Sequence, residues 1–331
     1  MAGRSVLCGL FTEAAVWQSV LTLVLLYLGI VCAGQCVIAV IIDNMPALAH
    51  AVAHTITGID LEYFAENSRL YGIGAGFDTA GIRFSCTLLG LSYLIKESAS
   101  PARRNFCILL FLIIGTVGNM ISRTTVVGIA VACGYLFLSS LSLQKITIMI
   151  TGRKVLWTAG GGIMLVLLYY AGIYMYNTMP GVRSAFEYGF EGFINLVENG
   201  TFSTHSSDLL LNHIADIWPD NAKTWIIGDG YFTDPYDPSK FYMGTDMGYV
   251  RFFFYCGVTG FAFFLLYFIG CTYVLCKRWP HLMLLGVFLL ITQLIVWIKI
   301  PTDIFCFYAL LLLADTQKSL PANDALGNGQ E

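Results

Sequence analysis

The strongest constraint on the fold is a series of eight apolar runs, each close to the length that a lipid bilayer requires. A transmembrane helix needs about 20 mostly apolar residues, with about 17–25 as the usual range. Because backbone polar groups find no partners in lipid, such runs cross it as helices. The sequence therefore predicts an all-α, polytopic integral membrane protein with about eight transmembrane helices. The runs are 17–42, 79–95, 106–121, 124–140, 155–177, 249–275, 282–299 and 302–316.

The composition supports the membrane class and argues against some functions. Hydrophobic residues make up 57% of the chain and charged residues only 12%, a balance that no soluble domain needs. The net charge of −3 argues against a nucleic-acid partner. We expect a single transmembrane domain over 1–316, followed by a polar, disordered cytoplasmic tail over 317–331.

Lysine and arginine predict the orientation of the helices, because they accumulate in short loops on the cytoplasmic side. With the N-terminus inside, ten of the eighteen basic residues fall in short cytoplasmic segments. Both termini are then cytoplasmic. Two long segments, 43–78 and 178–248, lie on the outer side of the membrane.

The longer outer segment, 178–248, predicts a helical lid over the outer membrane face. Residues 183–198 form one expected amphipathic helix, with an apolar stripe at helical spacing. A second helix is expected over 206–217, ending before Pro219. The aromatic side chains of the stripe either pack against the core or form a platform on which sugars stack. The stripe consists of Phe186, Phe190, Phe193 and Val197.

Three arginines, Arg69, Arg123 and Arg251, lie at or just below the outer surface, where the loop rule predicts few basic residues. A charge at the centre of a membrane-spanning helix costs about 2.5–3.5 kcal/mol on insertion scales, so one that is kept there is a functional candidate. Guanidinium groups also match the geometry of phosphate oxygens. We interpret the three arginines as a site for a lipid-linked diphosphate.

Four short patches lie on the outer side of the protein; two of them contain Arg69 and Arg123, and Arg251 directly follows the residues that open the fourth. Each patch lies at the start of a span, in a tight turn between spans, or late in the long outer segment. In chain order they are Arg69-x-x-Gly72, the turn Ser122-Arg123-Thr124, the segment Gly228-Asp229-Gly230, and the helix start Asp246-x-x-Tyr249-Val250 with Gly257 and Gly260 further along.

In order and spacing, these patches resemble those of the O-antigen polymerase and O-antigen ligase family of bacterial membrane glycosyltransferases. The family shows an Arg-x-x-Gly segment leading into a span, a Ser-Arg-Thr-like turn, a Gly-x-Gly segment and a His-Asn-x-Tyr-Leu-like helix start. Here the histidine position is Asp246 and the asparagine position is Met247. The resemblance implies glycan transfer from an undecaprenyl-diphosphate carrier, at the periplasmic face of the bacterial inner membrane.

Among the activities in this family, we expect an O-antigen or surface-polysaccharide polymerase, which transfers the glycan to another lipid-linked repeat unit. The alternative is a ligase, which transfers it to lipid A–core oligosaccharide. The resemblance implies a reaction without metal or other cofactor, and the sequence has no Asp-x-Asp motif for a metal–nucleotide site. The expected partners are an undecaprenyl-diphosphate-linked oligosaccharide, membrane lipid and a chain-length regulator protein.

The resemblance, together with the chemistry of the side chains, assigns roles to individual residues. Arg123 is expected to bind the diphosphate and to stabilise its charge as it leaves. Asp246 is expected to accept a proton from the acceptor hydroxyl or to position that hydroxyl. The remaining candidates for substrate binding are Arg69, Arg251, Gly72, Gly228, Gly230 and Tyr249.

Each role has a structural alternative. Arg123 can simply extend from a helix end toward the aqueous interface, and Arg69 can mark a loop hinge. Several charged residues can pair with each other instead of with a substrate. The possible pairs are Asp246 with Arg251, Arg83 with Asp78, Lys299 with Asp303, and Arg183 with Glu187.

Two rival functions come from other classes of protein. A transporter, or flippase, of lipid-linked glycans would carry cationic residues along a path across the membrane, often within two pseudo-repeats. In this sequence the surplus cations cluster at one face, and no repeat is visible. A noncatalytic partner in an envelope assembly is the other rival, and the ordered set of patches counts against it.

Overall fold

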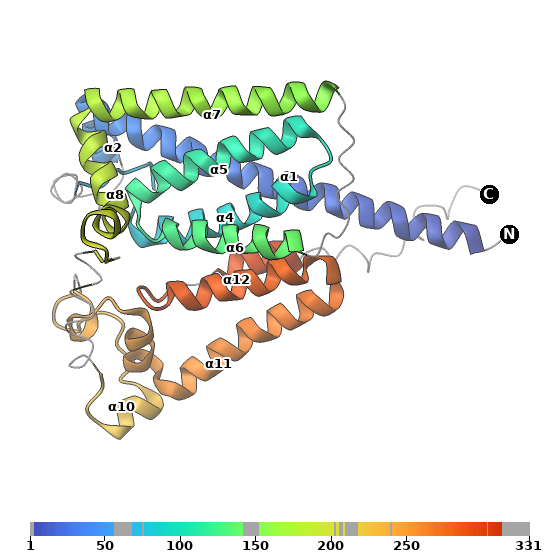
Figure 1. Cartoon of the computed structure of the whole chain (residues 1–331). Helices are drawn as coiled ribbons and strands as arrows, with labels where there is room; N and C mark the ends of the chain where they lie inside the picture. Colours follow the sequence, from blue (N-terminus) through green and yellow to red (C-terminus); the bar gives the residue numbers. More distant parts are fainter. Residues whose placement is uncertain are drawn as a thin grey trace, which may run out of the picture.

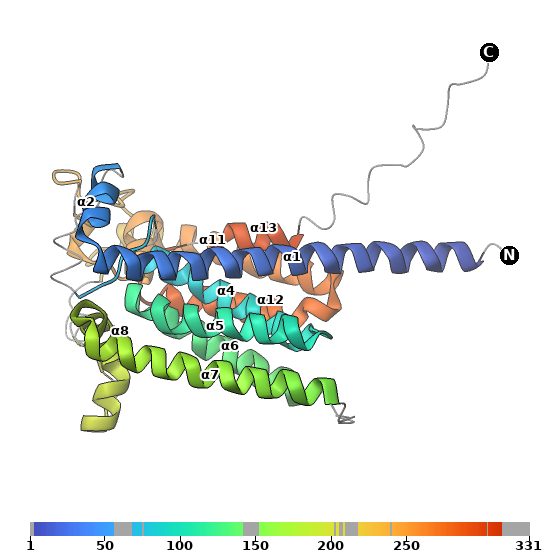
Figure 2. The ribbon, with the colours of Figure 1, turned by 90° about the horizontal axis from the view of Figure 1, so that it is seen from above.

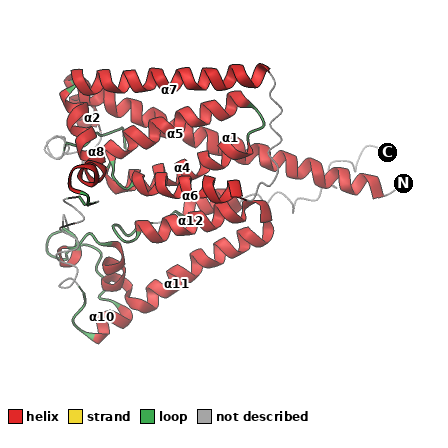
Figure 3. Ribbon diagram, in the orientation of Figure 1, coloured by secondary structure: helices red, strands yellow, loops and turns green. Residues whose placement is uncertain are grey.

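The computed structural model describes residues 3–55, 68–74, 76–141, 152–201, 203–204, 208, 218–238, 240–302 and 304–312. Within its helices, the side chains of 3–20, 141, 152–161, 164–165 and 168 lie outside this description. The described chain consists of helices and loops, with one isolated bridge between Thr233 and Phe241 (Figure 3).

Helices lie at all eight of the predicted apolar runs. These are α1 (Gly3–Asn44), α4 (Phe77–Glu97), α5 (Pro101–Ile121), α6 (Thr125–Leu141), α7 (Gly152–Thr178), α11 (Gly248–Arg278), α12 (Met283–Val296) and α13 (Phe305–Leu312). The shorter elements between them are α2 (Pro46–Thr55), α8 (Pro180–Asn199), α10 (Ala222–Ile227) and the 3-10 turns η1 (Tyr242–Gly244) and η2 (Pro280–Leu282).

The long helices run along one common direction, as Figures 1 and 2 show, with α11 leaning away from the rest toward α10. One end of this bundle carries α2, α8, α10 and the connections between α5 and α6 and after α12 (Figure 1). We call it the loop-rich end. The start of α1 and the α4–α5 and α11–α12 connections lie at the opposite end. The connections therefore alternate between ends as predicted, whereas which end faces the cytoplasm stays a prediction.

Three of the helices are long and apolar enough to cross a membrane, namely Leu21–Asn44 within α1, all of α5, and α11. Apolar side chains also face outward along the bundle, as at Tyr27, Leu167 and Phe263, which are 69%, 64% and 70% exposed. An apolar outer surface of this kind suits a lipid environment. The findings support an all-α membrane protein, and the count of eight spans stays a prediction.

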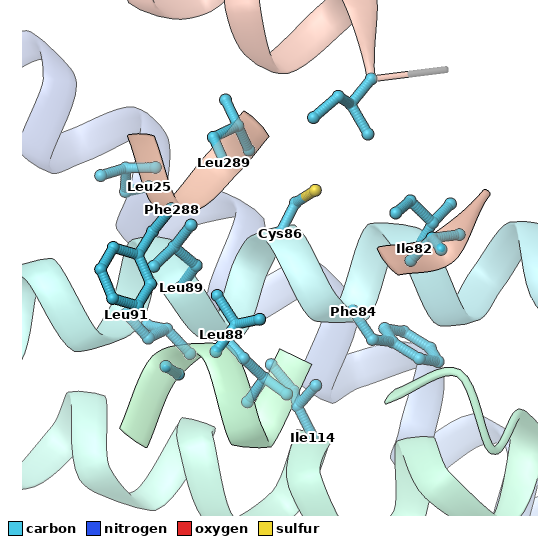
Figure 4. Close-up of a cluster of buried hydrophobic side chains, with 14 of the residues drawn as sticks. Leu25, Ile82, Phe84, Cys86, Leu88, Leu89, Leu91, Ile114, Phe288 and Leu289 are labelled. Atoms are coloured by element: carbon cyan, nitrogen blue, oxygen red, sulfur yellow. The ribbon is translucent and has the colours of Figure 1, made fainter. Parts of the chain in front are cut away.

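Helix α4 is the centre of the bundle, and it is buried along most of its length. Its neighbours approach closely because small residues line the contacts: a Cβ at Gly128 of α6 would collide with the backbone of Ser85. Close approach at small residues is the usual way in which helices pack within membranes. Around this axis, side chains from α1, α4, α5 and α12 form one apolar cluster, including Leu25, Leu88, Ile114 and Phe288 (Figure 4).

Helix α8 confirms the amphipathic helix predicted over 183–198 and extends it to Pro180–Asn199. It begins with Pro180 in its first turn, a position where proline costs no hydrogen bond, and ends at Gly200 with φ of 71°. Its buried face is made of small residues and one valine, whereas the aromatic stripe is partly exposed. The buried residues are Val182, Ala185, Gly189 and Gly192. The second predicted helix, 206–217, lies outside the described residues, apart from Asp208.

Candidate functional site

The turn between α5 and α6 orients Arg123 by binding the residues on either side of it. Ser122 Oγ and Thr124 Oγ1 both donate to Asp78 Oδ1 at the start of α4, at 3.0 and 2.6 Å. Thr125 Oγ1 donates to the Gly118 carbonyl at 3.0 Å and closes the turn. With its neighbours held against α4, Arg123 contacts the opposite side, which is α8.

Arg123 makes three contacts with α8. Its Nε donates to the Tyr188 carbonyl at 3.0 Å, its Nη2 forms an ion pair with Glu191 Oε2, and its Cζ lies 3.9 Å from the centre of the Tyr188 ring. The ring face attracts a cation placed over it. The Arg123 side chain is 15% exposed. It is therefore more enclosed than an arginine that simply extends from a helix end toward the aqueous interface.

Arg69 reaches the same aromatic ring from another segment of the chain. Its Cζ lies 4.9 Å from the centre of the Tyr188 ring and 6.0 Å from that of Phe77. The segment is attached to the end of α5, because the Leu70 N–H donates to the Met120 carbonyl at 3.3 Å. The structure therefore brings together Arg69 and Arg123, two predicted site residues, and we call them the arginine pair.

The arginine pair carries more positive than negative charge. Glu191 is the carboxylate that pairs with Arg123. Among the described residues, no carboxylate lies within ion-pair distance of Arg69, and its buried Nε has no hydrogen-bond partner. Two guanidinium groups on one ring repel each other unless anions compensate them. This arrangement favours an additional anionic ligand.

Small residues allow α8 to lie this close to the arginine pair. A Cβ added to Gly189 would come within 3.0 Å of the Asn119 carbonyl oxygen. Asn119 Nδ2 in turn donates to the Gly189 carbonyl at 2.6 Å. The main chain of α8 therefore packs directly against the end of α5. This contact fixes the position of Tyr188 relative to Arg123.

Asp78 links three segments at the loop-rich end. Besides Ser122 and Thr124, it binds Lys299 after α12, with 3.2 Å between Nζ and Oδ1. Burial works against ionisation of Asp78, but Lys299 and the two hydroxyls outweigh it and hold the pKa of this carboxyl below its usual value. Asp78 therefore acts as an ionised structural anchor for the turn that carries Arg123.

This anchor differs from one predicted ion pair and leaves another untested. Arg83 was expected to pair with Asp78, but Arg83 is exposed and Lys299 occupies that carboxylate. The predicted partner of Lys299 was Asp303, which lies outside the described residues. The predicted pair of Arg183 with Glu187 is confirmed, with 3.0 Å between Nε and Oε1.

Arg251 lies in a different environment from the arginine pair. Its Cζ lies 3.9 Å from the Phe232 ring centre and 4.0 Å from that of Phe241, and its Nη2 donates to the Phe232 carbonyl at 3.0 Å. We call the two rings the aromatic clamp. Arg251 is only 5% exposed, so it holds the end of the 178–248 segment onto α11. The structure does not join it to the arginine pair.

The Gly228-Asp229-Gly230 segment attaches this loop to a break in α11. At Gly257 the helix leaves helical geometry, with φ of 64°. The N–H groups of Asp229 and Gly230 donate to the carbonyls of Phe254 and Tyr255 at 2.6 and 3.1 Å. Helix carbonyls that a break leaves unpaired need such partners. These two glycines therefore have a structural reason to be present, and their role as substrate contacts stays a prediction.

The other predicted residues are placed as follows. Tyr249 donates its hydroxyl to the Leu294 carbonyl at 2.8 Å, which ties α11 to α12. Gly72 is buried. Asp246 is exposed at the start of α11, and no ion pair joins it to Arg251 within the described chain. Asp246 lies just before α11, whose first turn lies at the loop-rich end (Figure 1), but within the described chain no contact links Asp246 to the arginine pair.

Sequence reasoning missed Tyr188 and the role of Glu191 as the partner of Arg123. A signal for Glu191 existed, because it lies one turn after Glu187 on the acidic face of the predicted helix. Tyr188 had no comparable signal. Within the described residues, no group of three or more His, Cys, Asp or Glu side chains is placed to hold a metal ion.

Comparisons with protein-family models, with curated proteins and with solved structures found no match for this chain.

Proposed function

We propose that this protein is a membrane glycosyltransferase that polymerises a surface polysaccharide. It takes a glycan from an undecaprenyl-diphosphate donor and transfers it to a lipid-linked acceptor repeat unit. The observation that carries the proposal is the convergence of Arg69 and Arg123 on Tyr188, with Glu191 as the carboxylate partner. Such a site is suited to an anion with more than one negative charge.

A diphosphate fits the arginine pair better than a single carboxylate does. Guanidinium groups bind phosphate oxygens through parallel N–H donors, and two neighbouring guanidiniums can divide the oxygens of one diphosphate between them. Arg69 and Arg123 lie on separate segments, each fixed by backbone or side-chain hydrogen bonds. Donors that are fixed in advance stabilise a leaving group without reorganising during the reaction.

In the proposed reaction, an acceptor hydroxyl attacks the anomeric carbon of the donor sugar. The new C–O bond forms as the bond from that carbon to the diphosphate oxygen breaks, and the hydroxyl proton passes to Asp246. Arg69 and Arg123 stabilise the departing carrier diphosphate. A direct displacement inverts the anomeric configuration. Asp246 is a candidate for this role because it is exposed and lies just before α11, which starts at the loop-rich end.

The proposal places the loop-rich end on the periplasmic side of the bacterial inner membrane. Eight helices would cross the membrane, with both termini in the cytoplasm and α8 as part of a periplasmic lid. The support for this orientation is the concentration of lysine and arginine in the loops of the opposite end, among them Arg103, Arg104, Lys277 and Arg278.

The decisive experiment is reconstitution of the purified protein in liposomes with an undecaprenyl-diphosphate-linked repeat unit. Formation of a glycan ladder on a gel supports the polymerase, and its loss is expected in Arg123→Ala. Arg103→Ala is the matched control, because Arg103 is exposed at the opposite end. The same assay with lipid A–core as the acceptor tests the ligase. A normal ladder from Arg123→Ala would remove the arginine pair from the mechanism.

A further inference from the structure

A groove of about 560 Å³ lies beside the arginine pair, between the end of α7 and one face of α8. Its volume is within the range of about 300–1,000 Å³ that is usual for small-molecule sites. The lining residues are Tyr176, Phe186, Glu187, Glu191, Ile194 and Glu198.

The groove follows from helical spacing on α8. Glu187, Glu191, Ile194 and Glu198 are separated by four, three and four residues, so they share one face of the helix. Tyr176 at the end of α7 completes the wall, and its ring meets that of Phe186 edge-on, with centroids 5.7 Å apart. One side of the groove is therefore aromatic and the other is lined by carboxylates.

Glu187 is held in place with one oxygen left available. Arg183 Nε and the Tyr176 hydroxyl both donate to its Oε1, at 3.0 and 3.1 Å. These two hydrogen bonds lower the pKa of the Glu187 carboxyl, so it is ionised at neutral pH. Within the described residues no group donates to its Oε2. An ionised carboxylate of fixed orientation is a strong acceptor for hydroxyl groups.

The chemistry of this groove differs from that of the arginine pair. Two of the three carboxylates are paired with arginines, Glu187 with Arg183 and Glu191 with Arg123. The remaining negative charge, at Glu198, disfavours phosphate and acidic sugars, whereas the hydroxyls and amines of uncharged or basic sugars can donate to all three carboxylates. Arg183 covers one face of the Tyr176 ring, with 5.3 Å from its Cζ to the ring centre, and Phe190 stacks on one face of Phe186 at 4.5 Å. The remaining ring surface is apolar and can contact the C–H groups of a sugar. Glu191 belongs to both places, because it lines the groove and pairs with Arg123.

We propose that this groove binds the sugars of the lipid-linked glycan and that it selects neutral or amino sugars over acidic ones. This inference rests on the proposed function, in which the diphosphate of the lipid-linked glycan lies at the arginine pair. The glycan then extends from Arg123 past Glu191 toward Tyr176 and Glu198. Repeat units whose first sugars carry carboxylates are excluded from this path.

The test uses the full chain in phosphatidylcholine nanodiscs, with chitotriose as a neutral probe and trigalacturonate as an acidic probe. Binding is followed by saturation-transfer NMR and calorimetry. Chitotriose is expected to bind at least about tenfold more tightly than trigalacturonate. Glu187→Gln is expected to weaken chitotriose binding by about tenfold, since a hydrogen bond to a charged group is lost. Glu97→Gln, which changes an exposed carboxylate at the opposite end, should leave it unchanged.

Equal affinity for the two trisaccharides, or no effect of Glu187→Gln, would overturn this inference. Glu198→Gln provides a second exposed variant on the same face and should weaken chitotriose binding as well. Pyrophosphate binding to the same samples is measured separately. If pyrophosphate binds through Arg69 and Arg123 while chitotriose does not bind, the groove inference fails and the diphosphate site stands. The reverse result removes the diphosphate site alone.

Discussion

The arginine pair and the aromatic clamp contain the same charged group in two different settings. Arg123 shares one aromatic ring with Arg69 and has a carboxylate beside it. Arg251 is enclosed between Phe232 and Phe241 and donates to a carbonyl of the loop that it holds. Both lie at the loop-rich end and both are shielded from water. A buried Nε without a hydrogen-bond partner occurs in both, at Arg69 and at Arg251. The first arrangement brings two guanidinium groups together, whereas the second uses a single guanidinium to hold a loop.

An arginine near a helix end of a membrane protein therefore does not identify a binding site by itself. The deciding property is whether the protein itself supplies hydrogen-bond acceptors and a counter-charge for the guanidinium group. In the clamp, a carbonyl and two rings surround a single guanidinium. In the arginine pair, two guanidinium groups contact one ring, and Glu191 is the described carboxylate that pairs with one of them, Arg123.

The largest effects are expected from replacing one arginine in the arginine pair and the one arginine in the aromatic clamp. Arg123→Ala is expected to lower chain extension by about 100- to 1,000-fold, the usual effect of losing a donor to a developing anion. It should cost less stability than Arg251→Ala, because Arg123 and its partner Glu191 are more exposed, at 15% and 27%. Arg251→Ala is expected to lower the free energy of unfolding by about 2–3 kcal/mol, because a buried hydrogen bond to a charged group is lost. Gel ladders and melting curves in detergent measure the two effects. Equal melting temperatures for the two variants would contradict the distinction.

The next test separates Arg123 from the anchor beneath it. Lys299→Met leaves Asp78 largely buried without its cation and is expected to destabilise the fold by about 2–3 kcal/mol, less than a fully buried pair because both side chains are partly exposed. The double variant Asp78→Asn with Lys299→Met should recover part of the loss. Pyrophosphate affinity in the folded fraction should change far less than it does in Arg123→Ala. A larger loss there would place Lys299 in the binding site itself.

Acid should reveal the same anchor. Since the pKa of Asp78 is lower in the folded protein than in the unfolded chain, its contribution to stability is present above the unfolded value of about 4 and is lost as the pH falls through the folded value. Unfolding measured at pH 7 and pH 3 should therefore show a smaller acid effect in Asp78→Asn than in the wild type. Equal acid sensitivity would argue against this role.

Gly228 and Gly230 provide a matched pair of substitutions, because both have positive φ but only one of them is closely packed. Gly228 has φ of 74°, and a Cβ there would lie 2.5 Å from the Tyr255 carbonyl carbon and oxygen. Gly230 has φ of 80°, but its Cβ would meet nothing within 4 Å. Gly228→Ala should therefore cost about 2 kcal/mol or more of stability, and Gly230→Ala about 1 kcal/mol from backbone strain alone. Limited proteolysis of the 228–244 loop measures its release. A reversed order would show that the loop is not docked in this way.

The smallest expected effect comes from removing the negative charge beside the arginine pair. Glu191→Gln should raise the affinity of the full-length protein for pyrophosphate by about fivefold, because Arg123 no longer has a competing carboxylate. Titration calorimetry at low salt measures the change. The same substitution at Glu97, which lies at the opposite end, is the control. A decrease in affinity would mean that Glu191 positions Arg123 more than it competes for it.

The helix positions could be predicted from the sequence because hydrophobicity adds up over about 20 residues, and a one-residue error hardly alters the sum. Which side chains meet was harder to predict. Arg69 and Arg123 were both identified, but their common ring belongs to Tyr188 on α8, which the local sequence does not mark. The pair of Lys299 with Asp78 joins residues 221 positions apart, and a nearer partner, Arg83, fitted the pattern equally well.

The glycines illustrate a different limit of prediction from sequence. Gly228, Gly230 and Gly257 were all noted from the sequence, and a substrate contact was the expectation for the first two. A glycine signals close approach of the main chain, but it does not say what approaches. Here the structure places the loop backbone of 228–230 against the broken helix at Gly257. That answer depends on how two distant segments fold together.

The ion pair of Asp78 and Lys299 also has a consequence for biogenesis. The chain is synthesised from its N-terminus, so α4 and the α5–α6 turn are made long before the segment after α12. Until then the Asp78 carboxylate has hydroxyl partners but no cation, and the turn that presents Arg123 is incompletely secured. A chain truncated before Lys299 would therefore lack the cation that completes the Asp78 anchor.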